Sequence, residues 1–276
     1  MSDDIDASTL EDGWQPTTPL ADSYARRFLF NWADMCAATA MLHGGVVVSD
    51  PAFRLADSRR PAGFSNCATL LQPLRAETLK TTMTEINAFF EFHDPSRRGE
   101  VLLCSLWPTP DLSRYGWHLM GHPPLHLLPA SAQPTQPPAE LRIERVRDQR
   151  GLDAWERVAI EGYPLEPLRD APSGVLMPAR WLDEPNASFW VGWQNERPVC
   201  ASMGWTQHGV NDVTMVATVP EARRRGFGEA LTWCAAQADP ELPAMLLSSD
   251  PGRPVYERMG FLPLHRITLW FRLRPY

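Results

Sequence analysis

Apolar residues recur at helix or strand spacing along most of the chain after residue 20. In the first half they predict a helix that Asp22 caps and that ends near Leu42. The pattern then predicts strands over residues 44–49, 66–71 and 101–106, a helix over residues 76–92 and a short element that ends at residues 117–121. Residues 1–20 are polar and acidic, and we expect a tail that is loose or lies on the surface.

The second half repeats this kind of alternation. It predicts a strand over residues 141–146, a helix over 152–161, a short helix near 179–182, a hairpin from 188–193 and 199–205, and a strand over 210–218. The proline-rich run over residues 129–140 is the clearest linker in the chain. We therefore predict a tail over residues 1–20, a first domain over 21–130, a linker over 131–140 and a second domain over 141–276.

One stretch, Val213–Cys234, carries the strongest chemical information. An apolar run rich in β-branched residues ends at Pro220, a basic loop with Gly226 and Gly228 follows, and apolar residues then repeat at helical spacing. This predicts a strand, a loop and a helix. The first N–H groups of such a helix, with a dipole worth roughly half an elementary charge, favour a phosphate or pyrophosphate. The glycine patterns of Walker loops and dinucleotide-binding loops are both absent from the sequence.

The pattern Arg223-x-x-Gly226-x-Gly228, placed after a strand and Pro220, resembles the acetyl-CoA pyrophosphate loop of the GNAT N-acetyltransferases. A second match lies downstream, where an apolar strand over residues 244–249 precedes Tyr256-x-x-x-Gly260-Phe261. The order and spacing of both matches agree with this family. The resemblance implies an α/β protein with the GNAT fold, a mixed and mostly antiparallel twisted sheet flanked by helices, over residues 141–276.

The resemblance also assigns roles to individual residues. It places the pantetheine arm on the backbone of Val216, Ala217 and Thr218, and it makes Tyr256 the proton donor to the departing thiolate. Ser249 stands where many members carry an asparagine that contacts the cofactor. The pyrophosphate would lie on the backbone N–H groups of Arg223, Arg224, Arg225, Gly226, Phe227, Gly228, Glu229 and Ala230. The arginines are also compatible with an ordinary solvated turn, and Tyr256 with a core tyrosine that only binds the thioester sulfur or a water.

The general base is less well defined. An ammonium group with a pKa of about 10.4 must lose a proton before its nitrogen can attack. Asp212, on the strand before the loop, is the best-placed candidate, and Glu161 and His208 are rivals. A carboxylate at this position can also simply cap a turn.

The first half resembles a degenerate copy of the second. ATLLQP at residues 68–73 resembles VATVP at residues 216–220, and Trp117-x-x-Met-Gly resembles Tyr256-x-x-Met-Gly. Leu79 and Thr81 replace the loop glycines, so we expect no pyrophosphate site there. Phe89 and Phe90 are adjacent on the predicted helix and point to different sides. We therefore expect the first half to dock through this helix on the second and to shape part of the acceptor groove.

The composition narrows the function classes. The chain has 276 residues and a formal net charge of −7, which argues against sequence-independent nucleic-acid binding. It has no apolar run long enough to span a membrane and no signal-like start, so we expect a cytoplasmic protein without membrane association. Five widely spaced cysteines indicate reduced thiols. His118, His122 and His126 have helical spacing, but prolines interrupt them and no further ligand accompanies them, so we expect no metal.

These observations predict an acetyl-CoA-dependent N-acetyltransferase in which a primary amine attacks the thioester directly. No acyl-enzyme is expected, because no cysteine lies beside a histidine near the motifs. The acceptor is a small molecule or a peptide whose identity stays open, as does the oligomeric state. Two alternatives are a sensor that binds acyl-CoA without turnover and a scaffold in a larger complex.

Overall fold

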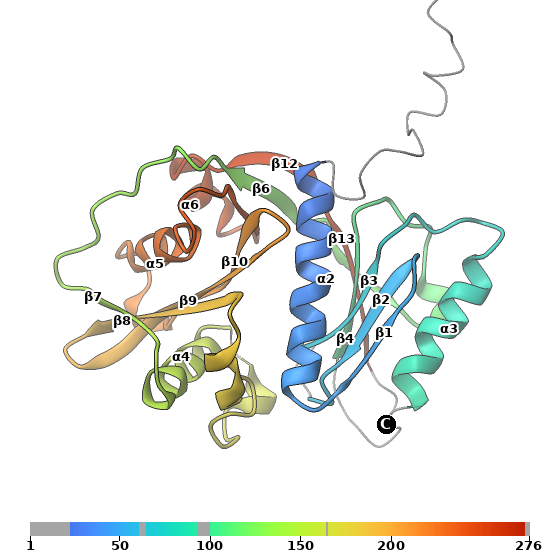
Figure 1. Cartoon of the computed structure of the whole chain (residues 1–276), viewed down its shortest axis with the longest axis horizontal. Helices are drawn as coiled ribbons and strands as arrows, with labels where there is room; N and C mark the ends of the chain where they lie inside the picture. The colour runs from blue at the N-terminus through green and yellow to red at the C-terminus, as the bar shows by residue number, and fades with distance from the viewer. Residues whose placement is uncertain (1–22, 61–64, 93–99, 164, 274–276) are drawn as a thin grey trace, which may run out of the picture.

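The computed structural model describes residues 23–60, 65–92, 100–163 and 165–273, which form two mixed sheets with helices packed against them. The first sheet has the strand order β1-β2-β3-β4-β13-β5, and the second has the order β12-β6-β11-β10-β9-β8-β7. Figure 1 shows helix α2 (Tyr24–Leu42) standing between the two sheets. No helix among the described residues is both long enough and apolar enough to cross a membrane.

The first half forms the elements that its periodicity predicts, together with two strands that it does not. The helix begins at Tyr24 with Ser23, not Asp22, as its N-cap, and Asp22 lies outside the described residues. The other elements of this half are β1 (Val46–Ser49), β2 (Phe53–Asp57), β3 (Asn66–Leu70), α3 (Leu79–Phe92), β4 (Glu100–Ser105), the 3-10 turn η2 (Ser113–Tyr115), β5 (His118–Gly121) and β6 (Pro124–Leu128). Strands β2 and β6 are the two that the pattern misses.

The second half follows its predicted order closely. Its elements are β7 (Arg142–Arg145), α4 (Gln149–Gly162), η3 (Glu166–Leu168), η4 (Ala179–Asp183), β8 (Ala187–Gln194), β9 (Arg197–Gln207), β10 (Val210–Thr218), η5 (Pro220–Ala222), α5 (Phe227–Ala236), β11 (Ala244–Leu247), α6 (Arg253–Arg258), β12 (Leu262–Arg266) and β13 (Thr268–Leu273). The predicted strand, loop and helix at residues 213–234 are confirmed.

The two halves exchange one strand each. Strand β6, from the first half, pairs with β11 and β12 in the second sheet, whereas the last strand, β13, pairs with β4 and β5 in the first. The short connectors before these strands lie against each other, because the Ile267 N–H donates to the Pro123 carbonyl at 3.0 Å. The two sheets therefore do not divide the chain at residues 131–140, as the predicted domain boundaries assumed.

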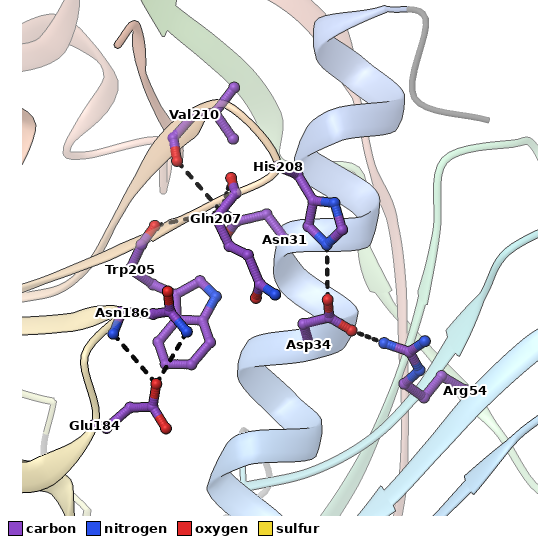
Figure 2. Close-up of polar contacts among 9 residues, drawn as sticks. All are labelled: Asn31, Asp34, Arg54, Glu184, Asn186, Trp205, Gln207, His208 and Val210. Carbon is purple, nitrogen blue, oxygen red and sulfur yellow. Dashed lines mark hydrogen bonds and ion pairs between the residues drawn. The ribbon is translucent and has the colours of Figure 1, made fainter. Parts of the chain in front are cut away.

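Helix α2 makes the docking contact between the halves. Its residues Phe28, Leu29 and Cys36 share a buried apolar cluster with Val210 of β10 and Met245 of β11. The buried Asn31 amide donates to the Gln207 carbonyl at 2.9 Å, and to those of Trp205 and Val210 at 3.3 and 3.4 Å (Figure 2). Docking of the halves is thus confirmed, but it uses α2.

The expectation that α3 provides the docking surface is wrong. Phe89 and Phe90 are both buried in the core of the first sheet, where their rings meet edge to face with centroids 4.8 Å apart. The core around this helix is wide enough to take both side chains.

The proposed match between Trp117 and Tyr256 is also wrong. Trp117 precedes a strand, β5, whereas Tyr256 lies within helix α6. Phe261 is more similar to Trp117 in its local setting, because each is buried directly after a glycine with positive φ, Gly116 at 83° and Gly260 at 94°. The alignment failed because both segments contain the same short apolar pattern.

Candidate functional site

The most distinctive feature of the second sheet is that two neighbouring parallel strands, β10 and β11, diverge after a short paired stretch. Strands β10 and β11 pair only at Asn211 with Ala244 and at Asp212 with Met245. Beyond these pairs β10 carries a bulge between Thr214 and Ala217, where Met215 has φ of 52°. We call residues 213–218 and 246–249 the strand fork. It leaves one edge of β10 without a neighbouring strand, as pantetheine binding by strand addition requires.

Helix α5 begins at the end of this fork. Gly226 is its N-cap, with φ of 79° and no capping side chain, so the N–H groups of the first turn are not used by a cap. Gly226 adopts a conformation that favours glycine, and an added Cβ would lie 3.4 Å from the Pro138 ring. A Cβ at Gly228 would lie 3.4 Å from the Thr218 hydroxyl. These features fit a backbone that approaches a pyrophosphate closely.

The three loop arginines differ in their contacts. Arg223 donates to the carbonyls of Thr218 and Gly162 at 3.1 and 3.0 Å. Arg225 donates to Gln194 at 2.7 Å, pairs with Glu140 at 3.3 Å and lies over the ring of Phe227. Arg224 is exposed and has no hydrogen bond or ion pair to another described residue. Only Arg224 therefore has an uncommitted guanidinium for a phosphate.

The segment predicted as a linker packs along this loop. Pro138 lies next to Gly226, Glu140 pairs with Arg225, and the Thr135 hydroxyl donates to the Glu229 carboxylate at 3.0 Å. Glu229 therefore presents its backbone N–H in the first turn of α5 while its side chain holds the linker. Ala230 is buried in the core below the loop.

Tyr256, on α6, is half-buried at the side of the fork. Its ring meets Phe261 edge to face at 5.8 Å. Burial raises the pKa of the Tyr256 phenol, and a hydrogen bond with Thr232 of α5 offsets part of this rise. The phenol is therefore protonated at neutral pH and able to donate a proton.

The structure adds Tyr163, which sequence reasoning missed. It follows the last turn of α4, and its hydroxyl donates to the Val216 carbonyl in the bulge at 3.1 Å. Burial of the hydroxyl raises the pKa of Tyr163, and the nearby Tyr256 adds to this rise, although the residue as a whole is 42% exposed. No sequence motif marks it, since its role depends on where α4 ends against β10.

Asp212 lies at the vertex of the fork, one residue before the strands part. Neighbouring Asn211 faces α5, because its amide donates to the carbonyls of Ala236 and Asp239. Strand alternation therefore turns Asp212 to the opposite face, towards α2. Its carboxyl is buried with one oxygen lacking a hydrogen-bond partner, and this burial raises its pKa to about 8.

The rival bases contact other side chains. His208 is at the tip of the β9–β10 hairpin, where it contacts Asp34 of α2 at 2.7 Å, and Asp34 also pairs with Arg54 (Figure 2). Glu161 lies near the end of α4 and contacts Arg197 at 3.8 Å. His208 thus supports docking of the halves, and it lies at the end of β10 that is remote from the fork.

Ser249 lies on the fork and caps the turn that leads into α6. Its hydroxyl accepts from the Gly252 N–H at 3.3 Å, and its carbonyl accepts from the Arg253 N–H at 2.9 Å. The structure thus gives Ser249 a local capping role. A role towards the cofactor stays a prediction.

A cavity of about 590 Å³ lies beyond Arg223, between α4 and residues 169–173. Arg223 and Glu161 line it, but neither Tyr256 nor Asp212 does. We therefore place the candidate chemistry at the fork, beside Tyr256 and the start of α5, and not in this cavity.

The three histidines with helical spacing do not gather. His118 stacks on Phe271 in the first sheet, His122 contacts the Thr268 hydroxyl at 3.3 Å, and His126 is buried in the second sheet. No group of three or more possible ligands is found among the described residues. All five cysteines fall in described segments and are free thiols, four of them buried.

No comparable fork is found between the described strands of the first half. Strands β3 and β4 pair in register from Cys67 with Leu102 to Leu70 with Ser105. Leu79 is buried in the core of the first sheet, and Thr81 is exposed on α3. A fully paired strand offers no free edge for a pantetheine arm, which supports the prediction of a degenerate copy.

Comparison with solved structures identifies the fold. The chain is similar to a GCN5-related N-acetyltransferase from Kribbella flavida, with a TM-score of 0.63 and 19% identity over 87% of this chain and 95% of that one. It is also similar to a tandem GNAT protein from the clavulanic acid biosynthesis pathway, with a TM-score of 0.51 and 13% identity over 90% and 95% of the two chains. A GCN5-related N-acetyltransferase from Sphaerobacter thermophilus gives a TM-score of 0.52 and 13% identity over 82% and 78%.

These likenesses confirm the predicted GNAT fold, and the similarity to a tandem GNAT protein over most of both chains confirms the tandem arrangement. No protein-family model matches the sequence, and no curated protein is similar to it at a significant level.

Proposed function

We propose that the protein is an acetyl-CoA-dependent N-acetyltransferase that moves an acetyl group to a primary amine of a small molecule or peptide. The observation that carries this proposal is the strand fork, which opens beside the uncapped N-terminus of α5. The open edge of β10 supplies peptide groups for the pantetheine amides, and the first turn of α5 supplies N–H groups for the pyrophosphate. The GNAT fold of the similar structures supports the same activity.

The residues at the fork suggest how the reaction proceeds. Asp212 takes a proton from the ammonium group of the acceptor through water, because its buried carboxyl is not in direct reach of the acceptor, and the neutral amine attacks the thioester carbon. The carbon–sulfur bond then breaks, and the thiolate, whose conjugate thiol has a pKa of roughly 8.5, takes the phenol proton of Tyr256. The attacking nitrogen gives its second proton to the phenolate as the amide forms, and Asp212 releases its proton to solvent. Because burial raises the pKa of Asp212 to about 8, its basic form accumulates as the pH rises through 8.

The cofactor assignment is tested by Gly226→Val. A β-branched side chain opposes the positive φ of 79° and places atoms over the first turn of α5, so we expect acetyl-CoA binding to be lost in calorimetry. Gly116→Val is the matched control, because it imposes the same strain at φ of 83° in the first half and should leave the affinity unchanged. Equal affinity of Gly226→Val and the wild type would exclude this loop as the cofactor site.

A second candidate function is a sensor that binds acyl-CoA without turnover. The burial of Asp212 beneath α2 favours it, because an acceptor amine has no exposed route to that carboxyl in this conformation. A screen of primary amines with detection of free thiol separates the two functions. Tight acetyl-CoA binding without thiol release from any amine would favour the sensor.

Tyr256→Phe tests the proposal that the protein is an enzyme with Tyr256 as its proton donor. We expect the rate constant for acetyl transfer to fall by roughly 10² or more, with little change in acetyl-CoA affinity, because the ring is kept and only the hydroxyl that supplies the proton is lost. Weaker binding with unchanged turnover would instead make Tyr256 a binding residue.

A further inference from the structure

Two carbonyl groups on the open edge of β10 already have hydrogen-bond donors. The Val219 N–H donates to the Val199 carbonyl, so this peptide faces β9. Because successive residues of a regular strand face opposite edges, the peptide group of Thr218 faces the fork. Val216 lies in the bulge, where this alternation does not apply, and its carbonyl is placed by its contact with Tyr163. The Tyr163 hydroxyl donates to the Val216 carbonyl and the Arg223 Nε donates to that of Thr218, each at 3.1 Å.

Both donors belong to one contact between the end of α4 and β10. Arg223 also donates to the Gly162 carbonyl at 3.0 Å, next to Tyr163. Gly162 packs so closely that an added Cβ would lie 2.8 Å from the Ala217 Cβ and 3.2 Å from the Thr218 nitrogen. The absence of a side chain at residue 162 thus brings the Tyr163 hydroxyl within reach of the bulge.

The two hydrogen bonds differ in how easily they are released. The Arg223 guanidinium donates to two carbonyls at once, so release of the Thr218 carbonyl would also disturb its hydrogen bond to the Gly162 carbonyl. The Tyr163 hydroxyl has a single hydrogen-bond partner among the described residues, and the residue is 42% exposed, so its side chain has room to turn towards solvent. The Val216 carbonyl is therefore the more accessible of the two for an incoming amide N–H.

Resting on the function proposed above, we propose that Tyr163 is a further residue of the cofactor site. Its hydroxyl holds the Val216 carbonyl until acetyl-CoA binds, and an amide N–H of the pantetheine arm then replaces it. One hydrogen bond is exchanged for another, so Tyr163 lowers the net gain from binding at this carbonyl. It also keeps a backbone acceptor at the half-buried bulge satisfied while the site is free.

Removal of the Tyr163 hydroxyl should strengthen cofactor binding, whereas substitutions at a binding site usually weaken it. Tyr163→Phe keeps the ring and removes the competing donor, so we expect acetyl-CoA and CoA to bind about fivefold more tightly in calorimetry, the equivalent of a net hydrogen bond of about 1 kcal/mol. Tyr115→Phe, in the first half and remote from the fork, is the matched control and should bind as the wild type does. Unchanged or weaker binding by Tyr163→Phe would overturn the inference.

Hydrogen exchange gives a second test in the unmodified protein. The Tyr163 N–H donates to the Ala159 carbonyl at 3.0 Å in the last turn of α4. If the hydroxyl releases β10, saturating CoA should speed exchange in residues 159–163 while it slows exchange in residues 213–218. Slower exchange in both segments would show that Tyr163 stays in place and would refute the inference. Absence of any CoA binding by the wild type would instead refute the proposed function itself.

Discussion

At the scale of single residues, burial decides which groups at the fork can take part in proton transfer. Tyr256 and Tyr163 both have a raised pKa because burial disfavours the phenolate, so both are donors at neutral pH. Burial changes the protonation state of Asp212 at neutral pH, because a pKa of about 8 turns an ordinary carboxylate into a group that titrates near neutral pH. The same burial lowers the stability of the fold when the carboxyl is ionised.

Asp212→Asn tests both consequences. The carboxyl keeps its proton in the folded state up to about pH 8 but loses it near pH 4 when unfolded, so folding stability falls as the pH rises from about 4 to 8. Asparagine cannot ionise, so we expect the variant to lose this slope and to be more stable at pH 8, on the order of a few kcal/mol.

Urea unfolding of wild type and Asp212→Asn across this pH range measures the effect. If Asp212 is also the general base, the stabilised variant should transfer acetyl groups more slowly and should lose the rise in rate towards pH 8. If the free energy of unfolding changes with pH in the same way in both proteins, the pKa of Asp212 is not raised by burial. Full activity of the variant would show that another group is the general base.

At the scale of elements, helix α2 joins the two halves through a few polar contacts set in an apolar interface. Asn31 donates to carbonyls at the end of β9 and the start of β10, and Asp34 contacts both His208 and Arg54. The paired Asp34 is about a quarter exposed, at 23%, whereas Asn31 is fully buried. Solvent screens the partly exposed Asp34 pairs, so we expect the fully buried Asn31 to be the more important contact.

We expect Asn31→Ala to reduce the free energy of unfolding by about 1–3 kcal/mol, because it leaves buried carbonyls of the β9–β10 hairpin without a donor. Denaturant unfolding measures the loss. Asn87→Ala is the control, since Asn87 makes comparable hydrogen bonds to Tyr115 and Trp117 within the first half.

Both Asn31→Ala and Asn87→Ala should be destabilised, but only Asn31→Ala should speed hydrogen exchange at residues 205–212. Equal protection of that hairpin in the two variants would show that α2 docks through apolar contacts alone.

At the scale of the whole molecule, the exchange of β6 and β13 makes each sheet depend on the other half of the chain. The second sheet contains the strand fork, yet β11 pairs on one side with β6 from the first half. The proline-rich segment is also fixed, because it contacts α5 through Thr135 and the loop through Glu140. The first half therefore contributes to the frame of the site even though its own described parallel pair, β3 and β4, stays closed.

A fragment of residues 137–276 should accordingly be poorly soluble or weakly active, because it lacks β6 and leaves β11 and β12 without their shared neighbour. Addition of a separately produced fragment of residues 1–136 should restore solubility and acetyl-CoA binding. Cleavage of the intact protein at an inserted protease site near Gln133 should leave the two pieces together on gel filtration, since each holds a strand of the other. A soluble 137–276 fragment with full turnover would contradict this dependence.

Local sequence determined the parts of this protein that depend on neighbouring residues. The Arg-x-x-Gly-x-Gly loop, the positive φ at Gly226 and the helix after it follow from side-chain size and periodicity within a few residues, and the predicted order of the second half was confirmed for that reason. Tertiary structure decided which distant segments contact each other. Strands β6 and β13 are short apolar strands whose own sequence does not name the sheet they join, so their exchange, the burial of Asp212 beneath α2 and the reach of Tyr163 to Val216 arise only when distant segments pack together.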